Sequence, residues 1–143
     1  MKIIQFLFSL IFLISMISRE QPTGNINIYI TGIEHENGTL YIALFSENDK
    51  FLEEASIEKK IPVEKQKKFE VTFENIPCGT YAVSVYHDLD DNGKLDSNFI
   101  GIPKEPVGFS NDHQPKMGPP KFDGAKFSLQ QDKLDLTINM YTY

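Results

Sequence analysis

The 143-residue sequence is acidic, with a formal net charge of −6, and it contains one cysteine and no tryptophan. Contacts to phosphate require a basic face, so this composition argues against nucleic acid as a partner and favours cations. The lone Cys78 excludes an intrachain disulfide, which leaves packing to hold the fold together.

The beginning of the chain has a pattern typical of export. Lys2 precedes an apolar run over residues 3–17, and small and polar residues follow from Ser18. This layout predicts a signal peptide over residues 1–18, because the run is short for a membrane span. A retained N-terminal anchor is the alternative. We therefore expect a secreted, periplasmic or cell-envelope protein with a single domain over residues 19–143 and no membrane span after cleavage.

Alternating apolar residues predict strands along the rest of the chain. The clearest segments place β-branched or aromatic residues at every second position and cover residues 25–31, 39–45, 68–73, 81–87 and 133–141. Residues 39–45 are apolar on both faces, as in a central strand. With two weaker strands, this order predicts an all-β fold, namely an antiparallel immunoglobulin-like β-sandwich of about seven strands.

Two stretches between these strands lack the alternation. Residues 49–60 are the only helix-like stretch, and they predict either one helical turn or a loop that bridges two sheets. The lysine-rich residues 64–68 predict an exposed turn.

Proline and glycine recur along residues 99–124, so regular structure beyond a few residues is not expected there. A loop of this length in a compact domain is usually functional or disordered. Its apolar side chains favour an ordered loop packed over one end of the sandwich: Phe99, Ile100, Ile102, Val107, Phe109, Met117 and Phe122. We expect a partner-facing surface whose contact residues are Phe109, Asn111 and His113, and a partner that is a protein or a glycan at the cell envelope.

The stretch VYHDLDDNGKLDSN (85–98) contains four aspartates. Asp88, Asp90 and Asn92 alternate and Gly93 follows them, which is the first half of the EF-hand calcium loop pattern. Alternate residues of such a loop point oxygen ligands inward, and the glycine permits the sharp turn that adds a backbone carbonyl, here that of Lys94. These oxygen donors predict calcium as the bound cation.

The second half of the EF-hand pattern fails, because its twelfth position is Phe99 instead of glutamate and no helices flank the loop. Asp96 holds the ninth position, where a carboxylate often acts through water. Further ligands must come from elsewhere, and Asn98 and Glu105 are the nearest. The predicted ligand set is therefore Asp88, Asp90, Asn92, the Lys94 carbonyl, Asp96 and Glu105.

A solvated hairpin turn without any ligand is the first alternative. Asn92-Gly93 suits a type I′ turn, but that turn does not account for the neighbouring carboxylates, whose charges repel without a cation. The second alternative is a metal-dependent hydrolase that uses His87, Asp88 and His113 where the loops converge. No HxH or HExxH spacing supports it, and we expect a non-enzymatic module.

Residues 75–127 resemble the secreted bacterial family called domain of unknown function 2141. The resemblance is carried by a G-x-Y-A-V strand, a H-D-x-[DN]-x-N-G-x-L-D loop, and G-x-P-x-E, G-F-S-N and G-P-P-x-F segments, here residues 79–83, 87–96, 101–105, 108–111 and 118–122. It implies export and a plan similar to transthyretin-like and carboxypeptidase regulatory-like sandwich modules. It implies no activity.

Overall fold

The computed structural model describes residues 21–63, 69–115 and 118–143. The predicted signal peptide (1–18), the predicted turn at 64–68 and the expected anchor Met117 lie outside these residues. Within them the strands are β1 (Thr23–Thr31), β2 (Thr39–Ser46), β3 (Ile57–Pro62), β4 (Phe69–Pro77), β5 (Gly79–Asp88), β6 (Val107–Phe109), β7 (Phe127–Leu129) and β8 (Lys133–Asn139). Two short helices, η1 (Ser110–Asp112) and α2 (Phe122–Ala125), complete the fold. Neither helix is long or apolar enough to cross a membrane.

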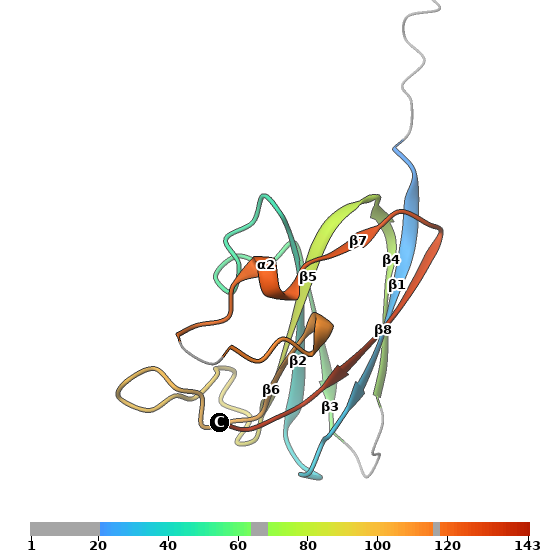
Figure 1. The fold of residues 1–143 in the computed structure, drawn as a ribbon. Coiled ribbons are helices and arrows are strands. Elements are labelled where there is room, and N and C mark those ends of the chain that lie inside the picture. Colours follow the sequence, from blue (N-terminus) through green and yellow to red (C-terminus); the bar gives the residue numbers. More distant parts are fainter. Residues whose placement is uncertain (1–20, 64–68, 116–117) are drawn as a thin grey trace, which may run out of the picture.

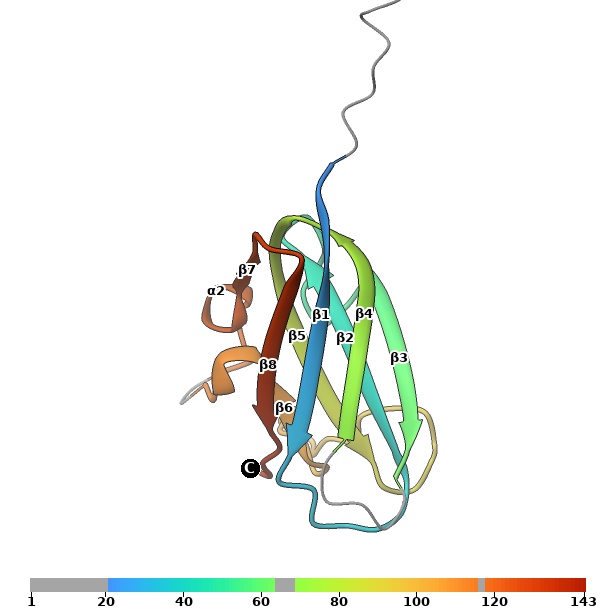
Figure 2. The ribbon, with the colours of Figure 1, turned by 90° about the vertical axis from the view of Figure 1, so that its right-hand side faces the viewer.

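The strands form two sheets that pack against each other as a β-sandwich (Figures 1 and 2). The smaller sheet has the order β4-β1-β8, and the larger has the order β3-β2-β5-β6, with β7 also paired to β5. The predicted all-β sandwich is therefore confirmed. The central place expected for residues 39–45 is also confirmed, because β2 lies between β3 and β5.

The core between the sheets follows from the period of two along the strands. Alternate side chains of β1, β2, β4 and β5 point inward and are buried: Ile26, Ile28, Ile30, Leu40, Ile42, Leu44, Phe69, Val71, Phe73, Tyr81, Val83 and Val85. The other buried members of this core are Val63, Ile76 of β4, Leu129 of β7, Ile138 of β8 and Met140. Among the described residues, this buried core extends from Ile26 to Met140.

One strand pair departs from the predicted antiparallel arrangement. β1 pairs with β4 antiparallel but with β8 parallel, with Ile28 opposite Leu136. A period-two pattern is the same whichever way the partner strand runs, so the alternation of residues 133–141 could not reveal this direction.

The stretch 49–60 also differs from its prediction. Residues 57–62 form the edge strand β3, paired with β2, and turns precede it. Its side chains are mostly exposed, including Lys59 and Lys60. Charged, solvent-facing residues are usual on an edge strand, where they oppose pairing with another chain, and they remove the alternation that marks a strand in sequence.

The described parts of the proline-rich segment, residues 99–115 and 118–124, pack against a face of the larger sheet instead of an end of the sandwich. A second buried cluster joins Ala82 of β5 to Val107, Phe109 and Ala125. Ala82 points away from the main core, because Tyr81 and Val83 on either side of it point inward. Phe99, Ile100 and Ile102, expected to anchor the segment, are exposed instead.

The outer face of the larger sheet also carries a stacked tyrosine pair. Tyr41 of β2 lies opposite Tyr86 of β5, with ring centroids 4.6 Å apart and planes 11° from parallel. Burial, reinforced by the charges of Tyr41 and Asp88, raises the pKa of Tyr86 from 10.0 to about 12.

The folded state therefore favours the neutral phenol of Tyr86, which gives an expected pH dependence. The contribution to stability is complete below pH 10.0, the unfolded value, and is lost as the pH rises through about 12. We expect Tyr86→Phe to show a smaller loss of unfolding free energy than the wild type over this range. Urea unfolding at a series of alkaline pH values measures it, and identical pH profiles for both proteins would contradict the assignment.

Candidate cation site

The site lies at the end of β5, where the carboxylate of Asp88 points toward the acidic loop (residues 88–96). The side chain of Asp88 is fully buried. Its Oδ1 accepts the backbone N–H of Asn92 (3.1 Å) and its Oδ2 accepts that of Gly93 (2.7 Å). One carboxylate thus closes the loop from 88 to 93, and Gly93 adopts the positive φ of 80° that the tight turn requires.

Glu105 reaches the same loop from the proline-rich segment. It is 5% exposed, and its Oε1 accepts the backbone N–H of Leu89 (2.8 Å). Its Oε2 accepts the backbone N–H of Asp96 (2.9 Å). The strand β5 fixes this position, since the N–H of His87 donates to the carbonyl of Pro106 (2.9 Å). Glu105 therefore joins the proline-rich segment to both halves of the acidic loop.

Asp90 completes a group of three carboxylates. Its exposed side chain accepts the N–H of Asn92 through Oδ1 (3.2 Å). One carboxylate oxygen from each of Asp88, Asp90 and Glu105 lies within 4.8 Å of the other two. Three of the six predicted ligands thus lie close together, and Glu105 is the one that comes from outside the loop.

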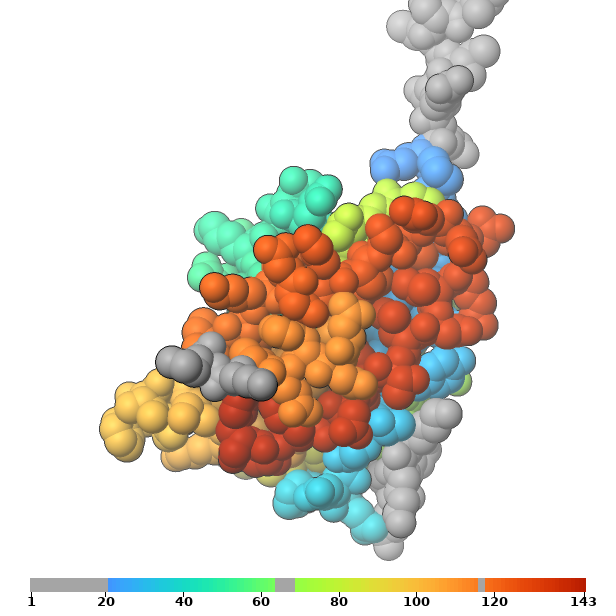
Figure 3. All heavy atoms as spheres, in the orientation of Figure 1, coloured from blue at the N-terminus to red at the C-terminus, as the bar shows by residue number. Residues whose placement is uncertain are grey.

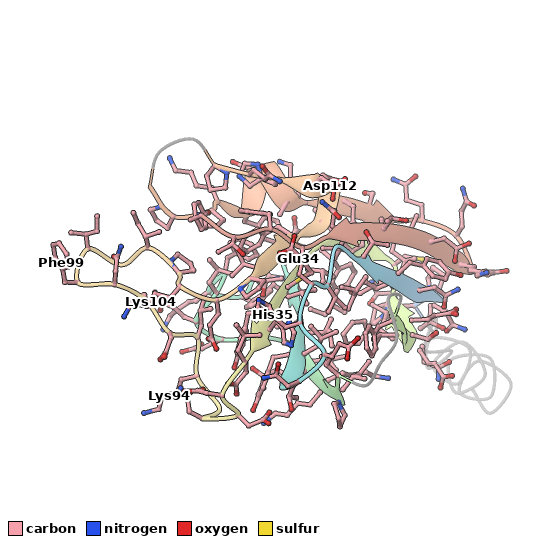
Figure 4. The ribbon with its side chains drawn as sticks, turned by 90° about the horizontal axis from the view of Figure 1, so that it is seen from below. Glu34, His35, Lys94, Phe99, Lys104 and Asp112 are labelled. Carbon is pink, nitrogen blue, oxygen red and sulfur yellow. The ribbon has the colours of Figure 1, made fainter. Side chains whose placement is uncertain are left out.

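The other predicted ligands have different partners. The Oδ1 of Asn92 accepts the N–H of Lys94 (2.8 Å), and its Nδ2 donates to Asp96 (3.4 Å). Asp96 meets Glu105 through its backbone N–H, and its carboxylate lies outside the group of three. The side chain of Lys94 extends away from the loop (Figure 4). Asn98 binds the N–H groups of Ile100 and Ile102 with its side chain.

Two residues outside the predicted ligand set also hold the acidic loop. The Nδ2 of Asn37 donates to the carbonyl of Leu89 (2.7 Å), and the hydroxyl of Thr39 donates to Asp91 (2.7 Å). Asn37 precedes β2 by two residues and Thr39 is its first residue, and each lies 52 residues before its partner. No local pattern signals such a contact, because the pairing of β2 with β5 creates it.

The donor set of the three carboxylates fits a hard cation. Each carboxylate has about four acceptor positions, and Asp88 and Glu105 each use two for backbone N–H groups. Asp88 and Glu105 are buried. No ion pair between described residues involves Asp88, Asp90 or Glu105. Buried charges require a partner, and oxygen donors of this kind suit calcium.

The two histidines of the hydrolase alternative do not come together. His87 is buried at the end of β5, with Nε2 2.6 Å from the carbonyl oxygen of Asn37. Its Nδ1 has no hydrogen-bond partner among the described residues. The ring of His113 lies instead against α2, so close to Gly124 that a Cβ there would stand 2.2 Å from it. Each ring is thus fixed by a different part of the fold.

A family model described as "Uncharacterized protein conserved in bacteria (DUF2141)" matches residues 28–137. The chain belongs to this family. The match runs from β1 into β8 and includes the whole acidic loop and Glu105, so the resemblance seen over residues 75–127 is confirmed. No curated protein and no solved structure matches the chain.

The residues expected to contact a partner differ in their exposure. Phe109 is 5% exposed in the second buried cluster, so the surface position predicted for it is wrong; the outward apolar face of β5 covers it. Asn111 is exposed, with a φ of 61°, and its Nδ2 donates to the carbonyl of Lys126 (2.8 Å). His113 is half-buried against Gly124. Contact of Asn111 and His113 with a partner stays a prediction.

Proposed function

We propose that this protein is an exported, non-enzymatic β-sandwich module that binds calcium between Asp88, Asp90 and Glu105. The observation that carries the proposal is the position of Glu105, which a separate segment delivers to the two loop aspartates so that all three ligand oxygens fall within 4.8 Å. A calcium ion bound here would offset the repulsion between the three carboxylates and link the acidic loop to the proline-rich segment.

The remaining oxygens of the predicted set are those of Asn92, the Lys94 carbonyl and Asp96. With a small, partly exposed set of carboxylates, the expected dissociation constant falls in the weak extracellular range of roughly 10⁻⁴ to 10⁻³ M. That range suits an exported protein, because calcium outside cells is far more concentrated than in the cytosol. The role proposed for the ion is to hold the surface of the proline-rich segment toward a partner at the cell envelope.

Calorimetric titration of calcium into chelator-treated protein tests this proposal, and Asp90→Asn is the sharpest variant. The asparagine keeps an oxygen for the N–H of Asn92 and removes one charge from the group of three. We expect calcium affinity to fall roughly tenfold, because calcium sites are tuned by the number of charged ligands. Unfolding in the presence of chelator is expected to match the wild type.

Asp91→Asn is the matched control. Asp91 is the next residue, is also exposed and accepts the hydroxyl of Thr39, but it lies outside the group of three. Its φ of 56° suits asparagine. We expect calcium affinity close to that of the wild type. Absence of heat and of any melting shift at millimolar calcium, or equal losses in both variants, would reject the site and favour a ligand-free structural module.

A further inference from the structure

Residues 96–104 form a small hairpin that projects from the body of the molecule (Figures 1 and 3). The N–H of Lys104 donates to the carbonyl of Asp96 (2.8 Å), and the N–H of Asn98 donates to that of Ile102 (2.8 Å). A bridge between Ser97 and Pro103 lies between these bonds. Glu105 follows directly, so the hairpin stands on the candidate cation site.

The apex of this hairpin is apolar and fully presented to solvent. Phe99 is 99% exposed and Ile100 is 65% exposed. The turn beneath them is fixed, because the Oδ1 of Asn98 accepts the N–H groups of both Ile100 and Ile102 at 3.0 Å. Gly101 provides the positive φ of 83°. The hydrogen bonds of the turn therefore hold two large apolar side chains outward, where they lose the benefit of burial.

We propose that this tip, Phe99 and Ile100, inserts into the surface of an anionic lipid bilayer. A stable protein interface needs about 800 Å² on each partner, which two side chains at the end of a convex hairpin do not provide. Insertion into lipid needs no complementary surface, only apolar side chains that reach the acyl boundary. For the same reason lipid fits this tip better than the protein or glycan expected from the sequence.

Two lysines near the tip can contact anionic headgroups, while three exposed aspartates of the neighbouring loop repel them. Lys94 and Lys104 are exposed, and both side chains point outward near the base of the hairpin (Figure 4). Lysines in this position can reach headgroups while apolar residues enter deeper. Asp90, Asp91 and Asp96 oppose such a surface, and a bound cation lowers that repulsion. Only this calcium dependence rests on the function proposed above; insertion of the tip does not.

The absence of tryptophan from the chain allows a direct test. Phe99→Trp places a single reporter at the tip, and Leu52→Trp places one at another exposed apolar position, 41% exposed, on the loop before β3. The protein from Gln21 onward carries every core residue of the described chain and avoids the apolar N-terminal run. With vesicles of phosphatidylcholine and phosphatidylglycerol, we expect a blue shift and quenching by brominated lipid for Phe99→Trp alone. A shift only in Leu52→Trp would overturn the proposal.

Co-sedimentation with the same vesicles gives the second readout. Phe99→Ser is expected to lower the bound fraction roughly tenfold or more. Leu52→Asn is the control and is expected to leave the bound fraction unchanged. Leu52 has a φ of 68°, a backbone conformation that suits asparagine. Equal binding of Phe99→Ser and wild type would overturn the insertion.

Chelator separates the two proposals. Tip-dependent binding that is the same with calcium and with chelator supports insertion and counts against the cation role. Calcium binding in the calorimeter with no vesicle binding overturns insertion and leaves the cation site standing.

Discussion

Replacement of Asp88 by alanine is expected to lower the free energy of unfolding by about 2 to 4 kcal/mol. The buried carboxylate accepts the N–H groups of Asn92 and Gly93, and alanine leaves both without this charged acceptor. A hydrogen bond to a charged group contributes more than a neutral one, and a buried donor left unpaired adds a penalty. Urea unfolding in chelator measures the loss without a contribution from metal.

Asp91→Asn serves as the control for this measurement, because the φ of 56° at this position suits asparagine. It removes a neighbouring carboxylate whose partner is the exposed hydroxyl of Thr39, so the expected change is below about 1 kcal/mol. Equal stability of Asp88→Ala and the wild type in chelator would show that the backbone of the acidic loop does not depend on this side chain.

Gly38→Ala is expected to be the most damaging single-methyl substitution near the site, at about 3 kcal/mol or more. Gly38 has a φ of 87°, and an added Cβ would stand 2.1 Å from the carbonyl oxygen of Asp88. Backbone on both sides of the contact would have to move, which displaces the end of β5. We therefore expect this variant to lose calcium binding as well, although Gly38 offers no ligand. Urea unfolding and calorimetry provide the two measurements.

Gly101→Ala separates the clash from the backbone strain. Gly101 has a similar φ of 83°, but a Cβ there would meet no atom within 4 Å. The expected loss is about 1 kcal/mol, which is the cost of a left-handed conformation alone. If both glycine variants lose the same amount, close packing of Gly38 against Asp88 is not what stabilises the loop.

The inward residues of the fold could be predicted because burial on one face leaves a period of two. Ile26, Ile28 and Ile30 show it clearly, and all three are buried. The same pattern contains no information on strand direction, so the parallel pairing of β1 with β8 was missed. The edge strand β3 was missed because exposure to solvent removes the alternation itself.

The candidate site was predictable where its residues are neighbours in sequence. The spacing of Asp88 and Asp90 placed two carboxylates in one curling loop, whereas Glu105 was one of two outside candidates, with Asn98. Its selection depends on the pairing of β6 with β5 and on the N–H groups of Leu89 and Asp96. Phe109 was misplaced for a related reason, since only the fold shows which face of β5 the proline-rich segment covers.

The place of β1 has a consequence for the order in which the molecule can assemble. β1 is the first strand of the described chain and β8 the last, yet β1 lies between β4 and β8 in the smaller sheet. Until β8 is in place, one edge of β1 is unpaired, and such an edge can pair with other chains. Most of the chain must be synthesised before this sheet can close, which makes its final pairing a late, long-range event in folding.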